Sequence, residues 1–396
     1  MSMMNTEPRY TVLLSSAGAI VGKEWPSYRR NAPPLTGLPN LPRTSAAWVD
    51  HSVDAAGHLL RVEREKPTFA VRVASLPGGV EETGDGTPEH PFVNLDSLRQ
   101  RFDRCLIHAM NCAGITLSVS VTGTVDYETH LPCGSSGDSV FYDFSQAEVG
   151  GSALIDAESM YGVCVVRDLR APYSVFGSGS WNMIYNNCSW GGPPPVSRRF
   201  MMRDAGSCAF DRCSFSAEEQ DRSFFGGLYG VTVAGGTFHT SGAPVFYEAH
   251  GCVFSGVSAV RDGSVYSLNY GLGGGLSSRF GAIVSARNSI FESCSVSHTC
   301  HLVYDENDIA SGNRVANLRY AAVSSCGGCT FDRCSAAVAV AGGDGGGYLC
   351  LQACAFYRNS GSVFHECTGN ALREGACPAS GPLYDSGYGH PMPCEP

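Results

Sequence analysis

The chain has 396 residues, of which 48 are glycine and only 16% are charged. This length exceeds one compact core, and much glycine with few charges indicates an all-β protein with many turns. The 43% of apolar residues excludes a disordered chain, and the absence of a continuous apolar run of about 18 residues excludes a transmembrane helix. A net charge of −10 argues against nucleic-acid binding, so we expect neither nucleic acid nor membrane insertion.

The N-terminal region is rich in proline and arginine, which disfavours helices and central strands. We therefore expect an extended attachment arm over residues 1–45. It contains no continuous apolar core of a signal peptide, so we expect the chain to fold in a reducing cytoplasm. Residues 46–78 are expected to form a small β unit, because segments 58–65 and 68–75 alternate apolar and polar positions on either side of Pro67.

The clearest helical pattern covers about residues 94–110, where apolar side chains recur at helical spacing. Asn94 or Asp96 can cap its N-terminus. The next segment, 116–127, alternates as a strand whose valines and leucine share one face.

From about residue 130 one motif recurs seven times: a cysteine or small residue, one further residue, an aromatic residue, two polar residues, and another cysteine or small residue. Its copies are centred on Trp190, Phe210, Phe238, Phe254, Phe291, Phe331 and Phe356. Equivalent residues stack about 4.8 Å apart in successive coils of a parallel β-helix, and cysteine suits a tight apolar corner. A β-sandwich would not explain seven copies. The motif predicts a parallel β-helix over residues 79–370 and a cap or tail over 371–396.

This interpretation places five of the aromatic residues in one buried, inward-facing row. They are Phe210, Phe254, Phe291, Phe331 and Phe356. The cysteines at the corners are expected to be mostly free thiols, namely Cys208, Cys213, Cys252, Cys294, Cys329, Cys334 and Cys354.

Residues 84–95, Gly-Asp-Gly-Thr-Pro-Glu-His-Pro-Phe-Val-Asn-Leu, resemble the opening segment of right-handed parallel β-helix proteins of the pectate-lyase-like superfamily. In that family a Gly-Thr-x-x-Asn-Pro-Phe-x-Thr-Leu stretch leads into a helix that caps the first coil. Here His90 replaces the usual Asn, and Asn94 replaces the usual Thr. Together with the coils the resemblance covers about residues 84–370, and it implies a fold more strongly than a function.

Carboxylates on the coils and their loops are the candidate catalytic groups, because glycosidases need two carboxylates about 5–9.5 Å apart. The candidates are Asp211, Glu218, Glu219, Asp305 and Asp332. Asp211 and Asp332 each follow an inward phenylalanine and should point outward beside an arginine. The alternative for these two is a solvated turn with a local ion pair. The loop carboxylates could equally be ordinary solvated charges.

The pair Cys326 and Cys329, with His298, Cys300 and His301 upstream, could suggest zinc. Zinc sites need two converging pairs of ligands, whereas Cys329 already has a place at a coil corner. We therefore expect no metal and no cofactor.

The order of arm, β unit, cap helix and long β-helix resembles viral, particularly bacteriophage, tailspike or fibre-type proteins. The resemblance implies a homotrimer in the virion that contacts other virion proteins through its arm and binds a host surface polysaccharide or receptor. Tyrosines lying among glycine and serine would suit stacking on sugar rings, namely Tyr229, Tyr247, Tyr266, Tyr270, Tyr304, Tyr320 and Tyr348. A polysaccharide hydrolase or lyase on the same fold and an extracellular cell-surface adhesin are the alternatives.

Overall fold

The computed structural model describes residues 11–14, 20–24, 41–77, 84–112, 114–134, 137–150, 153–157, 162–171, 180–191, 200–217, 223–241, 244–268, 283–304, 318–341, 351–373 and 379–381. The chain divides into two units. The first contains Met1–Asp50 and Val62–Ser189, and the second contains His51–Arg61 and Trp190–Pro396. In the described parts both consist mainly of β-strands, as the composition predicts.

The first unit contains a sheet of parallel strands that begins at a long β-hairpin, β3 (Arg43–Val53) and β4 (Leu59–Ser75). The tip of this hairpin, His51–Arg61, belongs to the second unit. From β4 the parallel pairing continues through β5 (Leu117–Val125), β7 (Ser139–Val149), β9 (Val163–Arg167) and β12 (Met183–Asn186). The apolar residues of β5 are buried on one face, as their alternation predicts.

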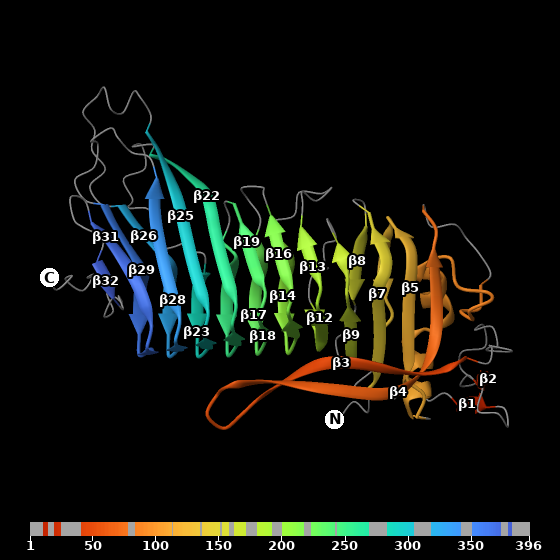
Figure 1. Ribbon diagram of the computed structural model, residues 1–396. Helices are drawn as coiled ribbons and strands as arrows, with labels where there is room; N and C mark the ends of the chain where they lie inside the picture. Colours follow the sequence, from red (N-terminus) through yellow and green to blue (C-terminus); the bar gives the residue numbers. More distant parts are fainter. Residues whose placement is uncertain are drawn as a thin grey trace, which may run out of the picture. The chain divides into compact units, whose positions relative to one another are not determined.

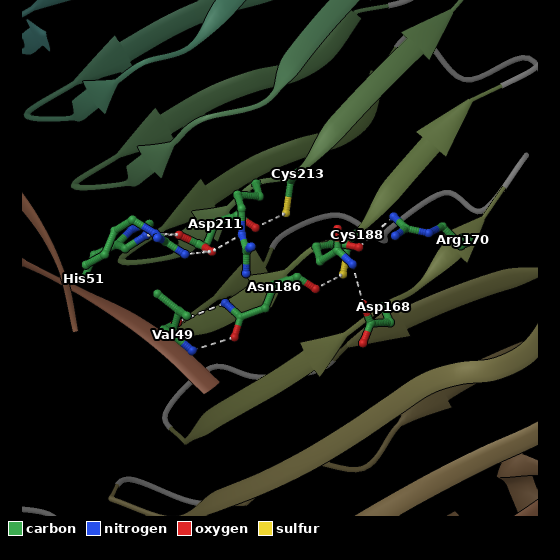
Figure 2. A network of polar contacts seen from close by, with 11 residues as sticks. Val49, His51, Asp168, Arg170, Asn186, Cys188, Asp211 and Cys213 are labelled. Carbon is green, nitrogen blue, oxygen red and sulfur yellow. Dashed lines mark hydrogen bonds and ion pairs between the residues drawn. The ribbon is translucent and has the colours of Figure 1, made fainter. Parts of the chain in front are cut away.

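Strand β4 runs from Leu59 through both predicted strand segments, 58–65 and 68–75, without a break at Pro67. Its pairing with β5 begins only at Phe69. The missing N–H of Pro67 therefore interrupts no hydrogen bond of that ladder. The side chain of Asn186 attaches the hairpin to β12, because its amide accepts from Val49 N–H at 2.8 Å and donates to Val49 C=O at 2.9 Å (Figure 2).

Other strands of the first unit are short. An antiparallel pair consists of β1 (Thr11–Leu14) and β2 (Ile20–Glu24), and a parallel pair consists of β6 (Glu128–Leu131) and β8 (Leu154–Ala157). The remaining ones are β10 (Arg170–Ala171), β11 (Ser180–Trp181) and β13 (Ser189–Gly191), whose last two residues belong to the second unit.

Two helices, α1 (Leu95–Arg101) and α2 (Arg104–Cys112), occupy the range in which one helix is predicted. Asn94 caps α1, as predicted, because its side chain accepts from Ser97 N–H at 2.6 Å. The helical pattern is interrupted at Asp103, whose carboxylate accepts from Leu106 N–H at 2.7 Å and so starts a second helix. Leu95, Leu98 and Phe102 are buried, as their spacing predicts.

In the second unit the strands repeat in groups of three, and each strand pairs in parallel with the strand three elements later (Figure 1). The first row contains β14 (Phe200–Gly206), β17 (Ser223–Tyr229), β20 (Phe246–His250), β23 (Ile283–Arg287), β26 (Leu318–Gly327) and β29 (Leu351–Ser360). The second row contains β15 (Ala209–Asp211), β18 (Thr232–Ala234), β21 (Val253–Ser255), β24 (Ile290–Glu292), β27 (Thr330–Asp332) and β30 (Val363–His365).

The third row contains β16 (Ser214–Ala217), β19 (Thr237–Thr240), β22 (Ser258–Leu268), β25 (Ser295–Tyr304), β28 (Ser335–Ala341) and β31 (Thr368–Arg373). At the end of the unit, β31 also pairs antiparallel with β29 and with β32 (Ala379–Gly381). An all-β chain with long parallel sheets built in this three-strand period is compatible with a β-helix.

The second row carries the aromatic row that the motif predicts. Phe254, Phe291 and Phe331 are buried and in register, and each neighbouring pair of rings is stacked with centroids 4.8 Å apart. Phe210 belongs to the same row, separated from Phe254 by Val233.

The prediction was wrong for one member of the row. Phe356 lies in β29 of the first row, opposite Val323. The two copies that were not placed in the row, Trp190 and Phe238, lie in β13 and β19. A small residue followed by an aromatic residue therefore occurs in all three rows, so the motif alone cannot specify the row.

Those corners explain the recurring cysteines. Ser207 stands at the corner before β15 and Arg212 at the corner after it, and both adopt a positive φ of 51°. The residue that follows each of them, Cys208 or Cys213, points inward. The backbone N–H of Ser207 donates to Tyr229 C=O, and that of Arg212 to Ala234 C=O, so the ladder continues around the corner. The buried thiol of Cys208 then donates to the carbonyl two residues earlier, at 3.3 Å.

Cysteine fits this place because it is small and needs only a weak partner. The predicted corner cysteines whose side chains are described are all buried thiols outside any disulfide, namely Cys208, Cys213, Cys252, Cys294, Cys329 and Cys334. The side chain of Cys354 lies outside the described residues.

Candidate functional site

Asp211 lies on the opposite face of β15 from the inward Phe210, as predicted, but it is not solvated. Its side chain is 0% exposed, because the tip of the β3–β4 hairpin covers it (Figure 2). The Arg61 guanidinium donates to both carboxylate oxygens at 2.6 and 2.9 Å, His51 Nε2 lies 3.4 Å away, and Arg212 Nε lies 3.2 Å away. The alternative of a solvated turn with a local ion pair is therefore wrong for Asp211.

Electrostatics explains how this buried carboxylate stays charged. Burial acts to raise the pKa of Asp211, but the hydrogen bonds from His51 and Arg61 and the charge of Arg61 outweigh it and hold the pKa well below its usual range. His51 Nδ1 also lies 2.9 Å from Thr232 Oγ1. With its oxygens held by three side chains, Asp211 anchors the hairpin tip.

The solvated ion pair is confirmed for Asp332, the equivalent residue of β27. Its side chain is 22% exposed and lies 2.7 Å from His365 Nδ1 and 2.8 Å from Arg333 Nη2. Arg333 also reaches Glu292 at 2.8 Å. Arg333 is half-exposed and is shared between the two carboxylates, so these contacts stabilise the fold little.

The predicted loop carboxylates Glu218, Glu219 and Asp305 lie outside the described residues. Within the described part of the chain, no group of three or more His, Cys, Asp or Glu side chains could hold a metal ion. Burial raises the pKa of Cys326 to about 12 and also raises that of Cys329, which disfavours the thiolate that zinc requires. No helix among the described residues is long and apolar enough to cross a membrane.

An exposed aromatic platform lies on the first row of strands. Tyr229, at the end of β17, is 40% exposed, and its ring stacks on His250 of β20 with centroids 5.5 Å apart and planes 7° apart. Of the other predicted tyrosines, Tyr247 is partly buried, and the side chains of the rest lie outside the described residues, namely Tyr266, Tyr270, Tyr304, Tyr320 and Tyr348.

Strand alternation brings two carboxylates to the same platform. Asp204 and Glu248 pair in register with Gly227 from either side, and Tyr229 pairs with His250. Side chains alternate across a strand, so these residues share the outer face, while the intervening Ala205, Leu228 and Ala249 are buried. We call the set Asp204, Gly227, Tyr229, Glu248 and His250 the Tyr229 face.

Gly227 gives this face its shape. A Cβ at this position would lie 3.0 Å from both Asp204 Oδ1 and Tyr229 Oη, so glycine lets the tyrosine ring lean over its own strand. Partial burial raises the pKa of Tyr229, and the charges of Glu248 and Asp204 raise it further. Glu248 also lies 3.5 Å from His250 Nε2. The result is an apolar ring beside two strong hydrogen-bond acceptors.

Tyr229 is among the tyrosines predicted from the sequence, whereas its neighbours Asp204, Glu248 and His250 are not. The available signal is a triplet before each corner whose middle residue is apolar and whose flanking residues are polar, aromatic or glycine, at 204–206, 227–229 and 248–250. Only the register shows that these triplets lie side by side. The chain matches no protein-family model, no curated protein and no solved structure.

Proposed function

We propose that this chain is a right-handed parallel β-helix of the pectate-lyase-like type that serves as a virion spike or fibre and binds a host surface glycan through the Tyr229 face. The three-strand period and the stacked phenylalanines support the fold. The observation that carries the binding proposal is the exposed Tyr229 ring with Asp204 and Glu248 beside it.

The chemistry of this face suits a sugar. The apolar side of a pyranose ring stacks on an aromatic ring, and its hydroxyls donate to carboxylates. On the β14 side the register neighbour of Tyr229 is Gly206, so no side chain of that row covers the ring there. A neutral or amino sugar fits better than an acidic one, because a ligand carboxylate would be repelled by Asp204 and Glu248.

Binding is tested with the purified full chain on immobilised capsular polysaccharides and lipopolysaccharides. Tyr229→Ala should lose at least about tenfold in affinity, because the stacking surface is removed, whereas Tyr229→Phe should keep most of it. Val363→Ala is the matched control, since Val363 is an exposed apolar residue of β30, in a different row. Binding that survives Tyr229→Ala unchanged would exclude this face as the site.

The assembly is proposed to be a homotrimer in the virion that contacts other virion proteins through residues 1–45. Light scattering coupled to size-exclusion chromatography tests the trimer, and a monomer would contradict it. Pull-down of virion proteins by the full chain but not by one lacking residues 1–45 tests the arm. An exported cell-surface adhesin is the alternative location, and finding the chain on intact cells but not in virions would favour it.

A polysaccharide hydrolase is the second candidate function. Asp204 and Glu248 lie on either side of β17, two strand spacings or roughly 9–10 Å apart. That separation is close to the range in which inverting glycosidases place their acid and base. New reducing ends that appear with the wild type but not with Asp204→Asn or Glu248→Gln would establish hydrolysis.

A further inference from the structure

Three side chains on the outer face of the third row form a hydrogen-bonded chain. Ser216 Oγ in β16 lies 3.4 Å from His239 Nδ1 in β19, and His239 Nε2 lies 2.8 Å from Asp262 Oδ2 in β22. We propose that Ser216, His239 and Asp262 form a hydrolytic site for acyl esters. The site is separate from the Tyr229 face and does not depend on glycan binding there.

The strand register places these groups together. Phe215 and Phe238 pair in register and are buried, so the next residues, Ser216 and His239, pair on the outer face. Asp262 lies on the same face of β22, two residues beyond Val260, which is the register partner of His239. A diagonal neighbour of this kind is within reach of a histidine ring.

A register irregularity next to the carboxylate favours this orientation. The pairing of β22 with β25 shifts between Arg261 and Ser264, on either side of Asp262. Bulges increase the local twist and redirect side chains, and they are frequent beside active sites. The shift therefore supplies a local reason for Asp262 to turn toward β19.

The proton arrangement suits nucleophilic catalysis. A carboxylate only accepts hydrogen bonds, so the 2.8 Å contact with Asp262 places the imidazole proton on Nε2. The lone pair of a neutral His239 is then on Nδ1, where it can accept the Ser216 hydroxyl proton. Asp262 is a positioning residue that sets this tautomer, while Ser216 and His239 contact the reacting atoms.

Solvent and substrate can reach the serine. Ser216 is exposed, and the side chains of His239 and Asp262 are 29% and 48% exposed. On the other side of Ser216, Gly191 of β13 carries no side chain, and a Cβ there would lie 3.9 Å from Ser216 Cβ. Gly191 therefore places no side chain beside this flank of Ser216, which suits a small acyl group such as acetyl.

The reaction is balanced with water as the only co-reactant. Ser216 Oγ attacks the ester carbonyl carbon while its proton moves to His239 Nδ1. The carbon–oxygen bond to the alcohol then breaks, the alcohol takes the proton from Nδ1, and an acyl-serine remains. Water attacks the acyl-serine through the same base, which regenerates Ser216 and releases the carboxylic acid.

The test uses the full chain with a fluorophosphonate probe and with p-nitrophenyl acetate. We expect the probe to label Ser216, identified by peptide mass spectrometry, and the ester to be hydrolysed above the buffer rate. Ser216→Ala should abolish both signals, and His239→Ala should lower both by roughly 100-fold. Ser214→Ala is the matched control, because Ser214 lies on the same face of β16 two residues earlier and should leave both signals unchanged.

Asp262 is tested by its effect on kcat and KM. Asp262→Asn should lower kcat for p-nitrophenyl acetate while KM stays the same, and Asp262→Glu should restore part of kcat. Unchanged melting temperatures would show that these exposed substitutions leave the fold intact. A wild-type chain that takes no label, or labelling that persists in Ser216→Ala or His239→Ala, would overturn the proposal.

Discussion

Arg61 Nε lies 2.6 Å from Asp211 Oδ1, which joins two residues 150 positions apart in the sequence. Asp211 ends a three-residue strand of the second row, and Arg61 lies near the tip of the β3–β4 hairpin. The hairpin tip is held by this ion pair, by His51 and by close contact, since a Cβ at Gly57 would lie 2.8 Å from Ile290 Cδ1. In the sequence Asp211 resembles a solvated turn residue. Its contact with the hairpin tip makes it a structural anchor instead.

Replacing Arg61 should release this anchor. Arg61→Ala leaves Asp211 buried with fewer donors, and we expect the free energy of unfolding to fall by about 1–3 kcal/mol, less than for a fully buried pair because the Arg61 side chain is 46% exposed. Urea titration followed by fluorescence measures the change. Arg212→Ala is the control on the same carboxylate, and its 63% exposed side chain should contribute under about 1 kcal/mol. Equal losses for both variants would show that Arg61 has no special role.

The same anchor should be lost in acid. The pKa of Asp211 is lowered in the folded protein, so its contribution to stability is complete above the unfolded pKa of about 3.9 and decreases as the pH falls below that value. The stability difference between the wild type and Asp211→Asn should therefore be constant from pH 5 to 7 and shrink below about pH 4. If this stability difference already shrinks between pH 6 and pH 5, a titratable group other than Asp211 causes the pH dependence.

The buried thiols should make the protein sensitive to alkali but not to reductant. Burial raises the pKa of Cys252 to about 11, and the contact with the Cys294 thiol together with burial raises that of Cys334 to about 12. Thiols with raised pKa stabilise the fold fully below the unfolded value of about 8.5, and this contribution is lost as the pH rises toward 11–12.

Melting temperature and labelling check this prediction. Dithiothreitol should leave the melting temperature nearly unchanged at pH 7, and iodoacetamide should modify Cys252 and Cys334 only after unfolding. A large drop in melting temperature with reductant would show that disulfides form, and it would favour an exported surface protein over assembly in the cytoplasm.

The stacked phenylalanines should be sensitive to truncation. Phe331→Ala removes a buried ring whose centroid is 4.8 Å from that of Phe291, and the cavity should cost about 3–5 kcal/mol. Because a repeat protein can unfold locally, hydrogen exchange of β27 should be measured together with global unfolding. Phe331→Leu should cost clearly less, and equal costs for both variants would argue against a packed ring at this place.

Gly227→Ala should disturb the Tyr229 face without unfolding the protein. The new Cβ would lie 3.0 Å from Tyr229 Oη and Asp204 Oδ1, so the ring must move. We expect glycan affinity to fall by at least about fivefold, with a stability change within about 1 kcal/mol. Ser285→Ala, two strands away in the same register row, is the control. If Gly227→Ala leaves glycan binding unchanged, the position of the Tyr229 ring does not determine glycan recognition.

The sequence by itself determined the local features of this protein. Short parallel strands, buried corner cysteines and the Asn94 helix cap depend on residues within a few positions of one another, so composition and spacing can predict them. For the same reason the row of each aromatic residue could not be read from its motif, because the same residue pattern occurs in strands of all three rows.

Only the tertiary structure decided which residues meet. Asp211 is covered by Arg61 and His51, and Asp204 is brought beside Tyr229, because strand register and hairpin position join segments far apart in the chain. Ser216 meets His239 because two strands pair with matching phenylalanines inward, and a shift of one residue in either strand would turn that strand's polar side chain into the core. The local motif can align the phenylalanines of successive strands, but which distant segments become neighbours is a collective result of packing.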